Sequence, residues 1–287
     1  PHSMLVGLLS LARPAHTALS PAHATACARL AQHHRRVAAS PAASAPAHDA
    51  TPTATAKALD DVRAKVAAAA ALANRQTAPR LVAVSKTKPI EMLRECYDSG
   101  QRDFGENYAQ ELVDKCPLMP ADVRWRFIGK LQSKKAKLLL KEVPNLAAIE
   151  TLDSTRLADK LEKAAADAGR AAPLDVMIQV NTSPWEGTKN GLPVDEAPAL
   201  ALHLRAECPN LRLSGLMTIG APGESRCFET LAETRESVAA TLGLPAAELE
   251  LSMGMSGDFE AAIQAGSDSV RVGSSVFGAR SYPPKSD

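Results

Sequence analysis

The sequence has 287 residues, of which 45% are hydrophobic and 23% are charged, and its formal net charge is +1. A chain of this size can bury a large core without disulfides or a metal, and we expect one or two domains. The 33 basic and 32 acidic residues nearly balance, so no global field favours nucleic acid or an anionic membrane, and neither is an expected partner.

The five cysteines are widely spaced and form no CxxC pair, so neither a metal site nor a disulfide framework is predicted. A reducing compartment is the simplest inference, and a redox-responsive pair such as Cys96 with Cys116 remains an open alternative. No stretch reaches the ~20 apolar residues needed to span a bilayer.

The N-terminal segment differs in composition from the rest of the chain. Residues 1–3 resemble an expression-vector remnant before Met4, and residues 4–48 contain arginine but no aspartate or glutamate. This composition is typical of an organellar transit peptide and predicts a location in the chloroplast stroma or the mitochondrion. If the segment is only an Ala/Pro-rich tail, the protein is expected in the cytoplasm. In either case we predict disorder over residues 1–57.

From residue 58 onward, predicted helices and strands alternate. Strands are predicted at residues 81–84, 103–106, 125–129, 146–150, 174–181, 211–219, 249–253 and 269–272. Helices are predicted from about residue 58 and at 90–99, 107–115, 133–142, 153–169, 194–207, 228–242 and 259–265. Eight strands interleaved with helices predict a single (β/α)8 TIM barrel, an α/β fold, over residues 58–287. An open doubly wound sheet is the alternative, but no GxGxxG motif supports it.

Lys86 follows the first predicted strand, whose apolar residues 81–84 indicate burial on both faces. Active sites of barrels lie at the carboxyl ends of the strands, so Lys86 is placed to react with a ligand. Apolar surroundings disfavour the ammonium form of a lysine, and a neutral amine condenses with an aldehyde to form a Schiff base. The alternative is a lysine that extends into water, which is the role we expect for Lys88.

The residues after the last strand predict a phosphate site. Gly273 and Ser274 offer backbone N–H and hydroxyl groups, and barrels commonly bind phosphate after strands seven and eight. Ser252, at the predicted end of strand seven, is placed to add another donor. An unliganded Gly/Ser turn is the alternative for the tripeptide Gly273-Ser274-Ser275. Together with Lys86, these residues predict a phosphorylated aldehyde bound as an imine.

Six motifs, in this order, closely resemble the pyridoxal phosphate homeostasis proteins. They are residues 82–89 (VAVSKTKP), 104–108 (FGENY), 127–133 (FIGKLQS), 215–218 (GLMT), 252–256 (SMGMS) and 271–278 (RVGSSVFG). That family is related to the amino-terminal barrel of alanine racemase, the type III fold of pyridoxal-phosphate enzymes. The resemblance covers about residues 59–280. The chain departs from the family pattern at Arg126, Lys134 and Thr188, where histidine, asparagine and serine are usual.

The resemblance implies a role for each candidate residue toward pyridoxal 5'-phosphate. Lys86 would form the Schiff base, Asn107 and Met217 would lie beside the cofactor, Ser252, Gly273 and Ser274 would hold its phosphate, and Arg271 would face the pyridine nitrogen. Because arginine stays protonated, the ring nitrogen would stay unprotonated and be a poorer electron sink. Transaminase-type chemistry is therefore disfavoured.

The resemblance further implies a vitamin B6 carrier that stores pyridoxal phosphate or delivers it to apo enzymes, with at most weak racemase-like activity. We expect a monomer. The alternative is an amino-acid racemase that uses Lys86 with a second base such as Tyr108, although the chain to Asp287 leaves no room for the β-rich domain of alanine racemase. A phosphosugar enzyme without cofactor is a third hypothesis, and it would need Glu106 or Glu150 as general base.

Overall fold

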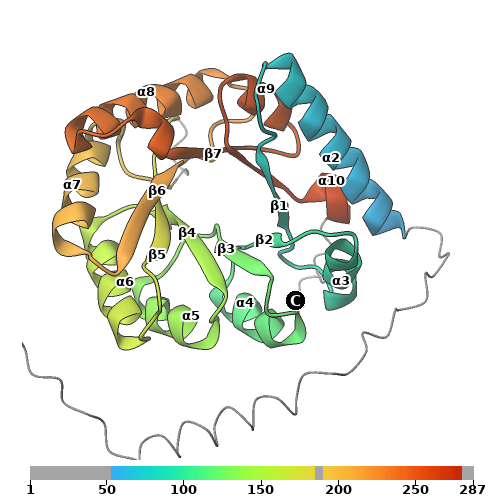
Figure 1. Ribbon diagram of the computed structural model, residues 1–287, viewed down its shortest axis with the longest axis horizontal. Helices are drawn as coiled ribbons and strands as arrows, with labels where there is room; N and C mark the ends of the chain where they lie inside the picture. Colours follow the sequence, from blue (N-terminus) through green and yellow to red (C-terminus); the bar gives the residue numbers. More distant parts are fainter. Residues whose placement is uncertain (1–52, 185–189, 280–287) are drawn as a thin grey trace, which may run out of the picture. The chain divides into compact units, whose positions relative to one another are not determined.

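The computed structural model describes residues 53–184 and 190–279, and these form one closed barrel of eight parallel strands in the order β1 to β8 (Figure 1). The strands are β1 (Arg80–Val84), β2 (Asp103–Glu106), β3 (Arg124–Phe127), β4 (Leu146–Leu152), β5 (Leu174–Gln179), β6 (Leu211–Met217), β7 (Glu250–Met255) and β8 (Ser269–Val272). The barrel closes where β1 pairs with β8, from Arg80 opposite Ser269 to Ala83 opposite Val272. The predicted single-domain TIM barrel is confirmed.

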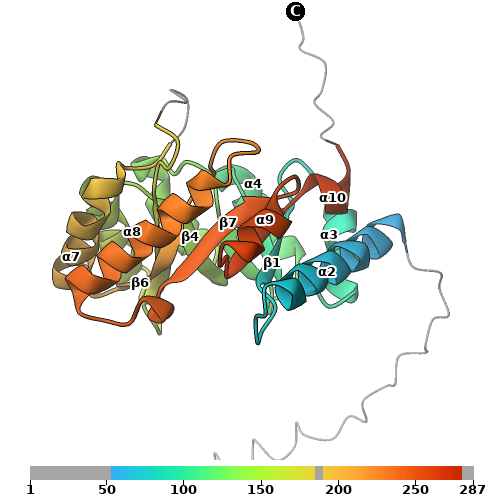
Figure 2. The same ribbon diagram turned by 90° about the horizontal axis from the view of Figure 1, so that it is seen from above.

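The α-helices lie outside the ring of strands, as the two perpendicular views in Figures 1 and 2 show. They are α2 (Ala54–Leu72), α3 (Ile90–Asp98), α4 (Ala109–Lys115), α5 (Ala136–Glu142), α6 (Thr155–Asp167), α7 (Ala197–Glu207), α8 (Arg226–Leu242), α9 (Phe259–Gln264) and α10 (Ser274–Phe277). Short 3-10 turns are η1 (Cys116–Leu118), η2 (Ser133–Lys135), η3 (Val194–Glu196) and η4 (Ala246–Glu248). Helix α2 packs on α3, α9 and α10 and so covers the outside of the β8–β1 junction.

Alternation along the strands divides the buried residues into two sets. On one face, side chains such as Phe104 and Trp125, whose ring centroids are 5.8 Å apart, join the helices in a continuous apolar core. Residues one position along point into the barrel, because successive strand side chains face opposite sides. That interior includes buried charged groups, among them Arg126, Glu150 and Arg271.

The first helix begins earlier than the sequence predicted. Thr53 caps α2 by accepting a hydrogen bond from the backbone N–H of Ala56 at 3.2 Å, and such a cap stabilises the first turn. Residues 54–57, which we assigned to the disordered N-terminal region, therefore belong to α2. The predicted vector remnant, the transit peptide and Thr188 lie outside the described residues. In the parts of the chain that the structure describes, no helix is both long and apolar enough to cross a membrane.

Candidate functional site

A cavity of about 400 Å³ opens at the carboxyl ends of the strands. Its walls contain six of the seven residues predicted to bind a cofactor, namely Lys86, Asn107, Met217, Arg271, Gly273 and Ser274. The other lining residues are Val84, Lys88, Ile128, Ile219, Met255, Ser256, Gly257 and Gly278. Three of the lining residues are basic, and none of the described ones is acidic. The cavity therefore combines apolar walls with a positive charge that suits an anionic ligand.

A sharp turn after β1 separates Lys86 from Lys88. The backbone N–H of Lys88 donates to the Ser85 carbonyl at 3.1 Å, and Thr87 has a φ of 60°, a left-handed conformation that β-branched residues rarely adopt. The Lys88 ammonium donates to three carbonyls at the end of α10, those of Phe277, Gly278 and Ala279, at 2.7–3.1 Å. Lys88 is thus committed to holding α10, and Lys86 remains the candidate nucleophile.

A buried polar network on α4 holds this turn from the side away from the cavity. Lys115 donates to the Ser85 carbonyl at 2.7 Å, to Glu106 at 2.8 Å and to Glu111 at 2.7 Å. Glu111 also accepts from the backbone N–H of Thr87 at 2.6 Å. These bonds offset the backbone strain at Thr87, which costs about 1–3 kcal/mol. They fix the direction in which Lys86 leaves the strand.

Asn107 is positioned by close approach of the neighbouring chain segment. A Cβ on Gly129 would lie 2.0 Å from the Asn107 carbonyl oxygen, so only glycine allows the segment after β3 to pack this tightly. The side-chain oxygen Oδ1 of Asn107 is buried and has no hydrogen-bond partner among the described residues. Since buried polar atoms are nearly always paired, this oxygen is a candidate acceptor for a ligand in the cavity.

The floor of the cavity is a buried set of charges inside the barrel. Arg271 donates to the Ser252 hydroxyl at 2.7 Å and to the Thr218 carbonyl at 2.7 Å. The Ser252 hydroxyl in turn donates to Glu150 at 2.6 Å, and Arg126 forms an ion pair with the same carboxylate. Burial alone would raise the pKa of Glu150, but the two guanidinium groups and the Ser252 hydroxyl outweigh it and lower the pKa. Glu150 is therefore ionised between two cations.

The prediction that Ser252 holds a phosphate does not fit this geometry. Its hydroxyl is fully buried below the cavity and is already occupied by Glu150 and Arg271. Strand β7 continues to Met255, past its predicted end at residue 253. Its pairing with β8 shifts register between Ser252 and Met255. The hydroxyl that reaches the cavity from this strand is that of Ser256, which accepts a hydrogen bond from the Gly273 N–H at 3.2 Å.

Apart from Lys86, the residues named in the two enzyme alternatives do not line the cavity. Tyr108 is 55% exposed and lies outside the lining set. Glu106 is buried behind the turn, where burial raises its pKa and Lys115 only partly opposes the shift. Glu150 is held by arginine. Cys96 and Cys116 are both buried, free thiols in this structure, so the proposed redox pair is not formed here.

The sequence did not reveal Ser256 as a site residue, nor the role of Lys115. Ser256 was part of a quoted motif, but the predicted strand end favoured Ser252 in its place. Glu111 and Lys115 are four residues apart on one helix face, a spacing that predicts an ion pair but not its contact with the turn at Thr87. That contact depends on how α4 lies beside the turn that follows β1.

Comparison with known proteins gives consistent matches. The family model described as "Alanine racemase, N-terminal domain" matches residues 58–281. The pyridoxal phosphate homeostasis protein of Bos taurus is 47% identical over 224 residues, which cover 73% of this chain and 80% of that protein. The homeostasis protein of Escherichia coli strain K12 is 42% identical over 235 residues, 79% of this chain and 97% of that protein.

Among solved structures, PipY of Synechococcus elongatus PCC7942 with PLP bound superposes with a TM-score of 0.64 and 30% identity, over 78% of this chain and 100% of that one. The segment matched by the family model contains every residue that lines the cavity.

The buried carboxyls predict opposite pH dependence in two matched variants. The folded-state pKa of Glu150 is lowered from its ordinary value of 4.5, so its ionised form stabilises the fold above that pH and this stabilisation is lost as the pH falls through the lowered value. Glu150→Gln should cost about 3–5 kcal/mol of unfolding free energy at neutral pH, because two buried arginines lose their counter-charge. The cost should shrink in acid.

Glu106→Gln is the comparison, because the pKa of Glu106 is raised from the same value of 4.5. As the pH rises from 4.5 through the raised pKa, Glu106 ionises and the wild-type protein loses stability. Glu106→Gln cannot ionise at this position, so it should gain stability relative to wild type over the same pH range. Urea unfolding of the three proteins, from a pH below the lowered pKa of Glu150 to neutral pH, measures both trends. A cost of Glu150→Gln that stayed constant with pH would contradict the assignment.

Proposed function

The chain belongs to the pyridoxal phosphate homeostasis protein family, within the alanine racemase N-terminal domain family, and we propose that it binds pyridoxal 5'-phosphate through a Schiff base to Lys86 and acts in vitamin B6 homeostasis. The observation that carries this proposal is the cavity itself. A lysine at the end of β1 shares one cavity with Arg271, two serine hydroxyls and an unpaired amide oxygen. The volume of the cavity, about 400 Å³, lies within the range of ~300–1,000 Å³ that is usual for small-molecule sites.

The phosphate would be held on the side of the cavity formed by the ends of β7 and β8. Ser256 and Ser274 offer hydroxyl donors there, and Gly257 and Gly273 contribute backbone. Gly273 already directs its N–H toward the Ser256 hydroxyl, which brings the two segments together. The absence of a carboxylate from the described cavity walls removes the repulsion that a dianionic phosphate would otherwise meet.

Lys86 is the group proposed to bind the aldehyde. Its neutral amine adds to the aldehyde carbon and one water molecule leaves, so the bond requires no further reactant. When bound, the cofactor supplies an electron-withdrawing ring conjugated to the imine. The turn at Thr87 and the bonds from Lys115 hold the Lys86 backbone in place before any ligand arrives.

Arg271 is proposed to face the ring nitrogen. The hydroxyl of Ser252 and the carbonyl of Thr218 hold its guanidinium at the cavity floor, and the carboxylate of Glu150 partly balances its charge. Burial lowers the pKa of Arg271, but a guanidinium remains protonated in proteins. It can donate a hydrogen bond to the ring nitrogen and cannot accept one, so the nitrogen stays unprotonated and carbanions gain little stabilisation.

A carrier role follows from these groups better than a racemase role. Racemisation by two bases needs a second proton acceptor across the cavity from Lys86, and Tyr108 is exposed outside it. We therefore propose that the protein holds pyridoxal phosphate and releases it to apo enzymes. From the composition of residues 4–48, we further propose that it does so in a plastid or mitochondrion.

The Schiff base predicts a specific covalent adduct. Pyridoxal phosphate added to the full-length protein and reduced with borohydride should yield one phosphopyridoxyl group, located on Lys86 by peptide mass spectrometry. Lys86→Ala should lose the adduct, whereas Lys88→Ala should keep it, since Lys88 bonds α10 carbonyls. An adduct on Lys88 in the wild-type protein would refute the assignment.

The phosphate site predicts ligand-selective losses. Ser256→Ala and Ser274→Ala each remove a hydrogen bond to a charged group worth roughly 1.5–3 kcal/mol, so pyridoxal phosphate affinity should fall about tenfold or more. Affinity for dephosphorylated pyridoxal should barely change. Ser275→Ala is the matched control, because Ser275 is exposed and outside the cavity walls. Equal losses for both ligands would argue against the phosphate contact.

The carrier role predicts slow exchange of the alanine α-proton. In D2O with bound cofactor and L-alanine, deuterium incorporation followed by NMR should not exceed that of the same concentration of pyridoxal phosphate alone. Tyr108→Phe should match wild type, because that phenol lies outside the cavity. Rapid exchange with racemisation would support the racemase alternative, and its loss in Tyr108→Phe would identify the second base.

A further inference from the structure

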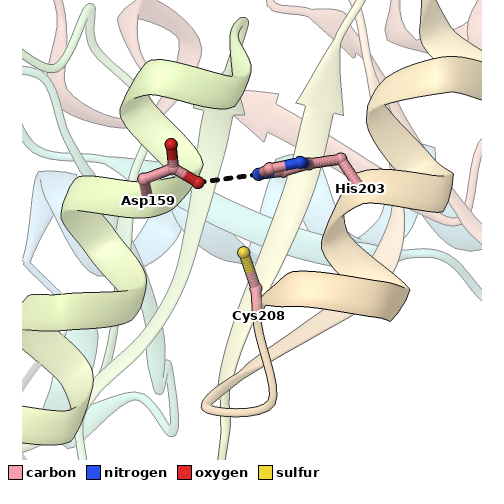
Figure 3. Close-up of side chains that lie close together, drawn as sticks. All are labelled: Asp159, His203 and Cys208. Atoms are coloured by element: carbon pink, nitrogen blue, oxygen red, sulfur yellow. Dashed lines mark hydrogen bonds and ion pairs between the residues drawn. The ribbon is translucent and has the colours of Figure 1, made fainter.

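Three potential metal ligands meet on the outer helices, away from the cavity (Figure 3). Asp159 belongs to α6, His203 to α7, and Cys208 is the residue that ends α7. Their ligand atoms all lie within 4.8 Å of one another, and the His203 Nε2 and Asp159 Oδ1 atoms are 2.7 Å apart. Among the described residues, no other group of three histidine, cysteine or acidic side chains comes this close.

The packing of α7 against α6 presents these side chains to one another. The Cys208 N–H donates to the Leu204 carbonyl and its own carbonyl accepts from Leu211, so the backbone around the thiol is fixed on both sides. Glu162, one helical turn after Asp159, accepts hydrogen bonds from both the backbone and the side chain of Asn210 at 2.9 and 2.6 Å. This carboxylate ties the loop after Cys208 to α6.

The surroundings of the cluster are negative. The carboxylates of Glu162, Asp159 and Glu207 all act electrostatically on the Cys208 thiol. Negative surroundings attract a cation, and a bound divalent ion favours the thiolate form of a cysteine ligand. Asp159 is 59% exposed, so an ion can enter from solvent.

We propose that Asp159, His203 and Cys208 bind one Zn²⁺ ion, with water in the fourth position. Thiolate, imidazole and carboxylate are the ligand types that zinc combines in tetrahedral sites, at about 2.3, 2.0–2.1 and 2.0–2.2 Å. Such bond lengths separate neighbouring ligand atoms by roughly 3.3–3.7 Å. The three side chains thus need shifts of about an ångström, which rotation of the exposed Asp159 and the partly buried His203 provides.

On binding, the Cys208 thiol proton leaves to solvent, and the imidazole of His203 carries its proton on Nδ1 so that Nε2 can bind the metal. The Asp159–His203 hydrogen bond is thereby replaced by two bonds to the metal. The ion then joins α6 to α7 and stabilises that part of the outer ring. The sequence predicted no metal site, because none of the usual short ligand spacings is present: Asp159 is 44 residues from His203. The proposal is independent of the cofactor and of Lys86.

Cobalt substitution tests the site on the full-length protein. After treatment with a chelator, Co²⁺ should give the visible ligand-field bands of a tetrahedral site, saturating at one equivalent and removed by Zn²⁺. These bands are used because pyridoxal phosphate absorbs where thiolate charge-transfer bands lie. Cys208→Ser should abolish the tetrahedral spectrum, and His203→Gln, at a partly exposed position, should weaken Co²⁺ binding at least about tenfold.

Cys27→Ser is the matched control, because Cys27 lies near His23 and His33 in the sequence and offers the same ligand types. This variant should bind Co²⁺ as wild type does. Zn²⁺ should also raise the Tm of wild type and Cys27→Ser but not that of Cys208→Ser or His203→Gln. Absence of a tetrahedral spectrum in wild type, its persistence in Cys208→Ser, or its loss in Cys27→Ser would each overturn the proposal.

Discussion

One buried carboxylate, Glu150, lies between two buried arginines inside the barrel, and the cavity depends on this arrangement. Arg126 pairs with it directly, and Arg271 reaches it through the hydroxyl of Ser252. Two cations and one anion leave a net positive charge below the cavity. Burying unbalanced charge is expensive, so an anionic ligand above Arg271 would recover part of that cost. The charges of the barrel interior thus add to the positive charge of the cavity walls.

The Arg126 side chain also explains how the chain accommodates its departure from the family pattern. An arginine replaces the usual histidine, and the carboxylate of Glu150 supplies the counter-charge that the larger cation requires. Because the Ser252 hydroxyl bonds the other carboxylate oxygen, Arg271 keeps its orientation. Arg126 and Glu150 are both buried, and neither is among the residues that line the cavity.

The sequence predicted the fold and most of the cavity, because both follow from alternation and from strand ends. Lys86, Asn107, Arg271 and Gly273 all follow or end predicted strands, and the closed barrel brings those ends together. Ser252 was misplaced for a physical reason. Its hydroxyl is held by Glu150 and Arg271, which come from two other strands, and no local pattern reports such contacts.

The Asp159–His203–Cys208 cluster was missed for a related reason, since it depends on the packing of two helices. The predicted cofactor residues lie at or near strand ends and took their roles from the family resemblance, whereas these three side chains come from separate helical turns. Helix-to-helix registry is decided by the summed fit of many apolar contacts. Sequence spacing carries little of that information.

The turn at Thr87 separates the two lysines that follow β1. Lys86 and Lys88 have the same chemistry and are two residues apart, but the turn at Thr87 sends Lys88 to the carbonyls that end α10. Its protons are therefore donated to the protein, and it is a poor partner for proton exchange at the ligand. Besides Lys88, the polar side chains that line the described part of the cavity are Lys86, Asn107, Ser256, Arg271 and Ser274. Proton transfer at a bound ligand would require one of these groups to act as an acid or a base.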